Sequence, residues 1–81
     1  MRFSALVEVR TRPGIADPEG ATIERSLPAL GFDGVSGVRV AKAFSFEVEA
    51  ADPAAARALA EDLSRRLLAN PVIEDAEVSV G

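Results

Sequence analysis

The chain changes structure abruptly near its C-terminus, within the run Arg65–Asp75. An alanine- and leucine-rich segment, which predicts a helix, reaches Asn70, and asparagine tolerates the left-handed conformation in which many helices end. Pro71 cannot continue the helix because it has no amide hydrogen to donate. We expect an extended segment to follow at once. A junction this tight fixes the angle between the helix and the next strand.

Alternation of apolar and polar side chains predicts four strands, because neighbouring strand residues point to opposite faces. These strands lie at residues 3–10, 35–40, 44–49 and 72–80. The segment Ala41-Lys42-Ala43 is the expected turn of a hairpin between the second and third strands. Neither glycine nor asparagine marks it, so longer strands with a displaced turn are the alternative.

Two helices begin with the same device, Asp17-Pro18 and Asp52-Pro53. The aspartate can cap free amides, and proline suits the first helical position. The first helix is expected to end at Gly31, with a bend or a loosened last turn at Pro28. The second helix carries an apolar stripe at helical spacing, formed by Ala56, Leu59, Ala60, Leu63 and Leu67.

The predicted order is β-α-β-β-α-β, and residues 1–81 make a single domain. The expected fold is α+β: a two-layer sandwich with a mainly antiparallel four-stranded sheet and both helices on one face. This is a ferredoxin-like arrangement. The uncovered face is expected to carry mostly polar side chains: Ser4, Leu6, Glu8, Arg39, Ser45, Glu47 and Glu49.

A chain of 81 residues buries only part of its surface, so a lone monomer has little stability to spare. It has no cysteine for a disulfide and no histidine for a typical structural zinc site. A hydrophobic content of 48% argues against disorder. Association with further copies is the remaining common route to stability, so we expect a homo-oligomer.

The residues offer little chemistry. Histidine, cysteine and tyrosine are absent, no histidine can activate a serine, and Lys42 is the only lysine. The chain is therefore expected to hold no catalytic residue, metal or cofactor. A net charge of −4 disfavours nucleic acid as a partner, since phosphate binding needs a basic face. No stretch has the length of a membrane span and no signal peptide is recognised, so we expect a soluble, cytoplasmic protein.

Three further features have ordinary interpretations beside functional ones. Glu47 and Glu49 share a face that could hold a cation weakly, but a solvated sheet face explains them better. The glycines within residues 31–37 predict a helix stop and a turn, because no helix start follows them. Arg39 and Lys42 are either ordinary surface charge or contacts to an acidic partner surface.

Several stretches taken together resemble the family PurS, the small subunit of phosphoribosylformylglycinamidine synthase. The resemblance spans nearly the whole chain. It rests on Gly14-Ile15-Ala16-Asp17-Pro18-Glu19-Gly20, Leu30-Gly31-Phe32, Val38-Arg39-Val40-Ala41-Lys42 and Leu67-Leu68-Ala69-Asn70-Pro71-Val72-Ile73-Glu74-Asp75. The sequence departs from the family pattern at Ala41, where glycine is usual, at Ala43 and Ala76, where an aromatic residue is expected, and at Pro28.

The resemblance implies a subunit without a catalytic site in an ATP- and glutamine-dependent ligase of purine biosynthesis. That ligase converts formylglycinamide ribonucleotide to its amidine. The subunit PurL carries the synthetase site, and PurQ carries the glutaminase site. The small subunit would bridge them, support ammonia transfer, and form a dimer or a dimer of dimers. ATP and magnesium would be used by the complex and not by this chain.

By position, the resemblance implies partner-facing residues at Arg39, Lys42, Asn70, Pro71, Glu74 and Asp75. It implies structural roles for Asp17, Pro18, Gly20 and Gly31, with a close approach of another segment at Gly20. Maintenance of the fold is the alternative for all of them. The competing hypothesis for the whole chain is a small-molecule-binding regulatory module on a ferredoxin-like fold, which rests on fold analogy alone.

Overall fold

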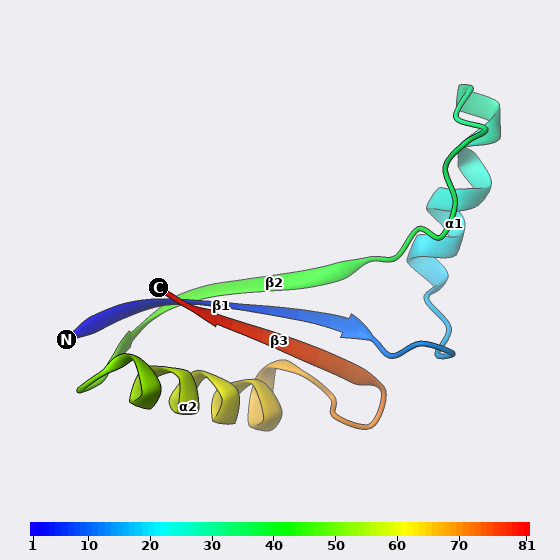
Figure 1. The fold of residues 1–81 in the computed structure, drawn as a ribbon. Coiled ribbons are helices and arrows are strands. Elements are labelled where there is room, and N and C mark those ends of the chain that lie inside the picture. The colour runs from blue at the N-terminus through cyan, green and yellow to red at the C-terminus, as the bar shows by residue number, and fades with distance from the viewer.

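A computed structural model describes residues 1–81. The chain forms three strands, two α-helices and two short helical turns (Figure 1). In chain order these are β1 (Arg2–Thr11), α1 (Pro18–Ser26), the 3₁₀ turn η1 (Pro28–Leu30), β2 (Ala41–Glu49), α2 (Pro53–Leu63), the π-helical turn η2 (Ser64–Leu68) and β3 (Glu74–Val80).

The sheet has the order β2-β1-β3, with both pairs antiparallel. Its odd-numbered β1 side chains face α2, and Val7 and Val9 are the largest fully buried side chains. Ala56 and Ala60 of α2 complete the core, because small side chains let the helix lie close to the sheet. The α+β class and the antiparallel sheet are confirmed.

The sheet has three strands, so the four-stranded prediction is not confirmed. Residues 35–40 form no strand: Gly37 takes a positive φ of 70°, and residues 33–40 make no backbone-to-backbone hydrogen bond. The predicted turn Ala41-Lys42-Ala43 is wrong, since these residues begin β2 and pair with Arg10, Val9 and Glu8. The chain lacks a residue that favours a tight turn here, so the strand runs straight through.

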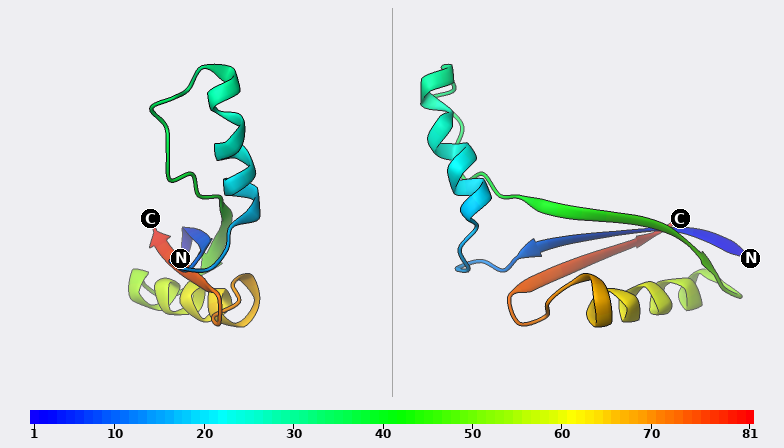
Figure 2. Two further views of the ribbon diagram at one scale, coloured as in Figure 1. Left: turned by 90° about the vertical axis from the view of Figure 1, so that its right-hand side faces the viewer. Right: turned by 180° about the vertical axis from the view of Figure 1, so that it is seen from behind.

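Only α2 covers the sheet, so the prediction of both helices on one face is wrong. The segment that holds α1 leaves the sheet at the end of β1 and returns at the start of β2 (Figures 1 and 2). It packs α1 against its own returning chain. The molecule is therefore elongated, measuring 52 × 25 × 14 Å along its principal axes. Neither α1 nor α2 has the length and hydrophobicity of a membrane-spanning helix.

Both helix starts follow the Asp-Pro prediction. Asp17 accepts a hydrogen bond from the Gly20 amide, and Asp52 accepts one from the Ala55 amide. The loosened end at Pro28 is also observed, because α1 stops at Ser26 and Pro28 begins the 3₁₀ turn. Gly31 then takes a positive φ of 89°, which closes this turn.

The helix-to-strand junction differs from the prediction. The last helical turn ends at Leu68, and no residue other than glycine has a positive φ, so Asn70 is not a left-handed cap. Residues 71–73 form a turn, and the strand begins at Glu74 instead of Val72. Asn70 acts here through its side chain, which accepts from the Val72 amide at 3.1 Å, a common turn device of asparagine.

The uncovered face of the sheet is polar, as predicted for its strand residues. Arg39 is the exception, because it precedes β2 and lies outside the sheet. Arg2 pairs with Glu47 at 3.1 Å and reaches Glu49 at 3.9 Å, which is consistent with a solvated face. Acidic residues outnumber basic ones there: Glu8, Glu47, Glu49, Asp75 and Glu77 stand against Arg2 and Arg10.

Candidate interaction surface

The corner formed by residues 70–75 joins η2 to β3 and is closed by its own polar groups. The Glu74 side chain accepts from the Asn70 amide at 2.7 Å, while the Asn70 carbonyl accepts from the Glu74 amide at 2.8 Å. Asn70 and Glu74 therefore lock each other in place. Val72, at the tip, is 77% exposed, so the corner presents an apolar side chain on a rigid support.

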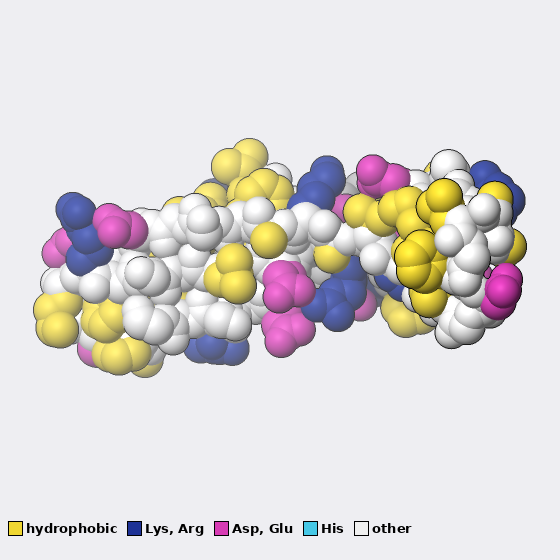
Figure 3. Space-filling view, turned by 90° about the horizontal axis from the view of Figure 1, so that it is seen from above, with side chains coloured by type: hydrophobic (Ala, Val, Ile, Leu, Met, Phe, Trp, Pro, Cys, Tyr) yellow, Lys and Arg dark blue, Asp and Glu magenta, His cyan; other side chains and the backbone are white.

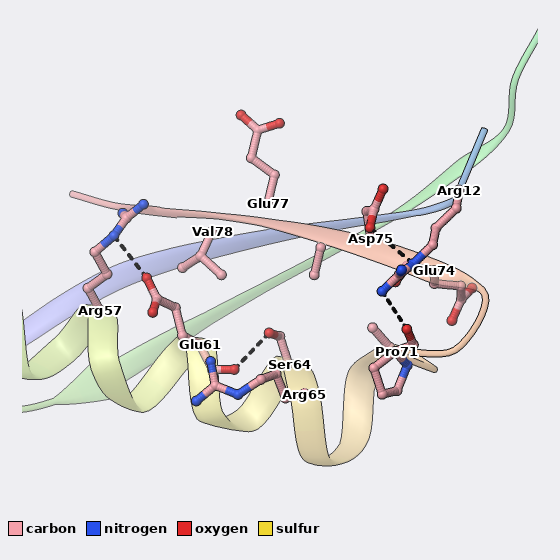
Figure 4. Close-up of a pocket in the computed structure, with 12 residues that line it drawn as sticks. Arg12, Arg57, Glu61, Ser64, Arg65, Pro71, Glu74, Asp75, Glu77 and Val78 are labelled. Atoms are coloured by element: carbon pink, nitrogen blue, oxygen red, sulfur yellow. Dashed lines mark hydrogen bonds and ion pairs between the residues drawn. The ribbon is translucent and has the colours of Figure 1, made fainter.

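Arg12 holds this corner against the end of β1 (Figure 4). Its guanidinium donates to the carbonyls of Pro71 and Glu74 and lies 3.3 Å from the Asp75 carboxylate. The Arg12 amide also donates to the Ile73 carbonyl at 2.9 Å. The sequence reasoning missed this residue. In the sequence, Arg12 is only an arginine that directly follows a predicted strand. Its neighbours in the sequence do not indicate that its contacts lie 59 to 63 residues away.

Arg39 and Asp75, both predicted to face partners, line one cleft of about 640 Å³ together with Arg10, Thr11, Pro13 and Gly14. The Arg39 guanidinium donates to the Thr11 hydroxyl at 2.8 Å and lies 3.9 Å from Asp17. Lys42 is not part of this group. It is exposed on β2, opposite Val9, and forms no ion pair.

The base of α1 is held by Asp17, whose two carboxylate oxygens serve two different segments. One accepts from the Gly20 amide at 3.1 Å, and the other accepts from the Val40 amide at 2.8 Å. The bonds from Val40 and Gly20 hold the pKa of Asp17 below its ordinary value, and the Arg39 charge adds to this. Asp17 therefore stays ionised and ties the helix start to the chain that enters β2.

Gly20 marks a close approach between α1 and the chain before β2. A Cβ atom at this position would lie 2.6 Å from the Val38 carbonyl oxygen and 2.7 Å from an Asp17 oxygen. Further along the helix, the Glu24 side chain accepts from the Val38 amide at 2.8 Å. Pro18 occupies the first turn of the helix. The helix and residues 38–40 thus form one rigid arm.

A second cleft, of about 470 Å³, runs between α2 and β3 (Figure 4). Only three of its twelve lining residues are hydrophobic, whereas small-molecule sites are mostly apolar. Its cations are already neutralised: Arg57 pairs with Glu61 at 3.1 Å, and Arg65 lies 3.8 Å from Asp62. The buried Ser64 hydroxyl donates to the Glu61 carbonyl. This cleft gives no specific support to a small-molecule site.

Comparison with known proteins identifies the relatives of this chain. Residues 4–81 match the sequence model of the family PurS, described as phosphoribosylformylglycinamidine (FGAM) synthase. The PurS subunit of that synthase from Methanothermobacter thermautotrophicus is 38% identical over 80 residues, which cover 99% of this chain and 94% of the relative.

Solved structures agree with this match. The PurS subunit of the Thermotoga maritima synthase superposes with a TM-score of 0.91 at 33% identity, covering 100% of this chain and 93% of that one. A chain in the structure of PurLQS from the same organism also gives a TM-score of 0.91 at 33% identity. That superposition covers 100% of this chain and 99% of the other.

Proposed function

Because the chain belongs to the PurS family of phosphoribosylformylglycinamidine synthase, we propose that it is a non-catalytic assembly subunit that bridges PurQ and PurL and supports ammonia transfer between them. The observation that carries the proposal is the likeness, over the full length of this chain, to a chain of the Thermotoga maritima PurLQS structure. The ATP and magnesium of the reaction would be held elsewhere in the complex, and the complex would work in the cytoplasm.

The side chains support a role in assembly. A proton-transfer group near neutral pH is most often histidine, and the chain has no histidine, cysteine or tyrosine. Its clefts are lined by arginines and carboxylates that already neutralise one another. Such a surface offers a shaped, charged platform to another protein.

The proposed contact surface is the corner Asn70–Asp75 together with Arg39, with Lys42 as a separate contact on β2. Two properties support the corner. Its backbone is locked by Arg12 and Glu74, so little entropy is lost on binding, and Val72 at its tip is an exposed apolar side chain. We also propose that the subunit is a homo-oligomer, because only nine of its 81 residues are buried in the single chain.

Co-elution with PurL and PurQ tests this function. The chain is mixed with both proteins, ATP-magnesium and glutamine, and is expected to elute with them as one complex. Val72→Asp should weaken the complex at least tenfold, because it places a charge in the centre of the contact. Ala58→Asp, on the exposed side of α2, is the matched control and should bind normally. Elution of the unaltered chain apart from both proteins would refute the proposal.

A further inference from the structure

The turn at the far end of the arm, where the chain begins its return from α1, is held by no hydrogen bond. Asp33 and Gly34 form this turn, and both are exposed. The Gly34 amide donates to no group, and the Asp33 carboxylate makes neither a hydrogen bond nor an ion pair. The nearest backbone anchors are the Phe32 amide, which donates to the Leu27 carbonyl at 3.0 Å, and the Val38 amide, which is bonded to α1. The peptide group between Asp33 and Gly34 is therefore free to rotate.

An aspartate side chain can react with the backbone amide that follows it. The amide nitrogen attacks the side-chain carbon Cγ, a nitrogen–carbon bond forms, and a carboxyl oxygen leaves as water together with the amide hydrogen. The product is a five-membered cyclic imide. Water then adds to one of its two carbonyl carbons. Addition at Cγ restores aspartate, whereas addition at the backbone carbon gives isoaspartate, in which the chain runs through the side chain. One water is released and one is consumed, so no other reactant is needed.

Gly34 supplies the nitrogen that this reaction needs. The attacking nitrogen must carry a hydrogen, belong to a peptide group that can rotate, and have little steric crowding. Glycine places no Cβ beside this nitrogen. The surroundings of Gly34 are also open, because no atom lies within 4 Å of its Cβ position. Packing therefore does not require glycine here, whereas the reaction is fastest with it.

The other aspartate and asparagine residues each lack one of these requirements. Three of them precede proline, whose nitrogen carries no hydrogen and cannot form the imide: Asp17, Asp52 and Asn70. Asp62 lies inside α2, where helical hydrogen bonds fix the next peptide group. Asp75 lies inside β3, and its carboxylate pairs with Arg12 at 3.3 Å. Asp33 is thus the one position in the chain where sequence and structure both permit the reaction.

We propose that Asp33-Gly34 is a modification site: Asp33 converts spontaneously to isoaspartate, and the product is a substrate for a protein carboxyl methyltransferase. The isoaspartate keeps the charge of aspartate, but it adds one carbon to the backbone and carries its free carboxylate on Cα. In the methyl transfer, an oxygen of this carboxylate attacks the methyl carbon of S-adenosylmethionine. S-adenosylhomocysteine leaves, and a methyl ester is formed.

The surroundings of the turn leave this carboxylate within reach of an enzyme. The helix α1 stands away from the sheet and from α2 in every view, so neither covers the turn (Figures 1 and 2). The apolar neighbours Leu30, Phe32 and Val35 are 70%, 54% and 49% exposed. Figure 3 shows hydrophobic side chains gathered at this end of the molecule. They offer contact area to an enzyme that binds the segment on both sides of Asp33.

Ageing of the isolated chain tests the site. The chain is kept warm in neutral buffer, and its isoaspartate is then measured by methyl transfer from labelled S-adenosylmethionine with a protein carboxyl methyltransferase. Trypsin cuts after arginine, so Asp33 is the only aspartate in the peptide 26–39. The label should accumulate in this peptide, and Gly34→Ala should lower it several-fold without unfolding the chain. Absence of label from the peptide, or equal labelling of the variant, would overturn the proposal.

Ala76→Gly tests whether the structure, and not the Asp-Gly pair alone, selects the site. This variant places the same pair inside β3, in the tryptic peptide 67–81. In the folded variant the label should stay in the peptide 26–39, because strand pairing holds Asp75 in place. In concentrated urea both peptides should be labelled alike. Equal labelling of the two peptides in the folded variant would refute the selection. The reaction needs only the chain and water, so these outcomes are independent of the co-elution with PurL and PurQ.

Discussion

The Asp17 carboxylate accepts a hydrogen bond from the Val40 amide at 2.8 Å, although the two residues lie 23 positions apart. Its other oxygen caps α1 through Gly20. One side chain thereby fixes the direction in which the arm leaves the sheet.

Asp17→Asn should destabilise the fold by about 1–2 kcal/mol. Asparagine can still cap Gly20 through its single carbonyl oxygen, but its amide group would face the Val40 amide, donor against donor. Asp52→Asn is the matched control, because Asp52 uses one oxygen only, toward Ala55, and asparagine caps equally well. Urea unfolding at one fixed protein concentration measures both. Equal losses for the two variants would contradict the double role of Asp17.

Acid should loosen the arm through the same residue. The pKa of Asp17 is lower in the folded chain than in the unfolded chain, so the unfolded state binds more protons as the pH falls below about 4. The stabilisation from Asp17 is complete above that pH and is lost as the pH falls through its folded pKa. Urea midpoints between pH 2 and pH 6 should show this, and the Asp17→Asn variant should lose less stability over that range. An equal loss of stability in the unaltered chain and the Asp17→Asn variant would contradict this role of Asp17.

Gly20→Ala should destabilise the arm, although alanine is the better helix former by about 1 kcal/mol. The new methyl group would lie 2.6 Å from the Val38 carbonyl oxygen, and this oxygen belongs to the backbone and cannot rotate away. Gly34→Ala is the control, since no atom lies within 4 Å of its Cβ position. Hydrogen exchange at the Val38 and Val40 amides should accelerate in the first variant alone. If hydrogen exchange at these two amides were unchanged in Gly20→Ala, α1 and Val38 would lie further apart than the structure indicates.

Arg12→Ala should release the corner that begins β3. The side chain supports two carbonyls and one carboxylate there, so we expect a loss of about 1–3 kcal/mol and weaker binding to PurL and PurQ. Arg66→Ala is the control, because Arg66 is largely exposed and pairs only with Asp62, which predicts a change within about 0.5 kcal/mol. Thermal unfolding and co-elution measure the two effects. If Arg12→Ala left both the unfolding temperature and the co-elution unchanged, Arg12 would not hold the corner in place.

The elements of the fold follow from local patterns, and their arrangement does not. Alternation in residues 3–10 and the two Asp-Pro starts act within a few residues, so the sequence predicts them well. Whether residues 35–40 form a hairpin with β2 depends on which segment they pack against. Contacts between residues far apart in the sequence decide this. The strand β2 runs straight through Ala41-Lys42-Ala43. This agrees with the absence of a residue that favours a tight turn there, which the sequence alone reveals.

The candidate interaction surface was only partly predictable for the same reason. The resemblance of residues 67–75 to a known family drew attention to the corner. The contacts of Arg12 with Pro71, Glu74 and Asp75 join segments about 60 residues apart, and no local pattern indicates them. The close approach of another segment at Gly20 was expected, but only the structure identifies the Val38 carbonyl as the group that approaches.

The most direct test of the assembly role compares two nitrogen sources for the synthesis of the amidine by PurL and PurQ, with and without this chain. With the chain present, glutamine should support the reaction. Without it, glutamine-dependent synthesis should be lost while synthesis from added ammonia persists, because the proposed function places the synthetase site in PurL and gives this chain a role only in the delivery of ammonia. Equal glutamine-dependent rates with and without the chain would contradict the account.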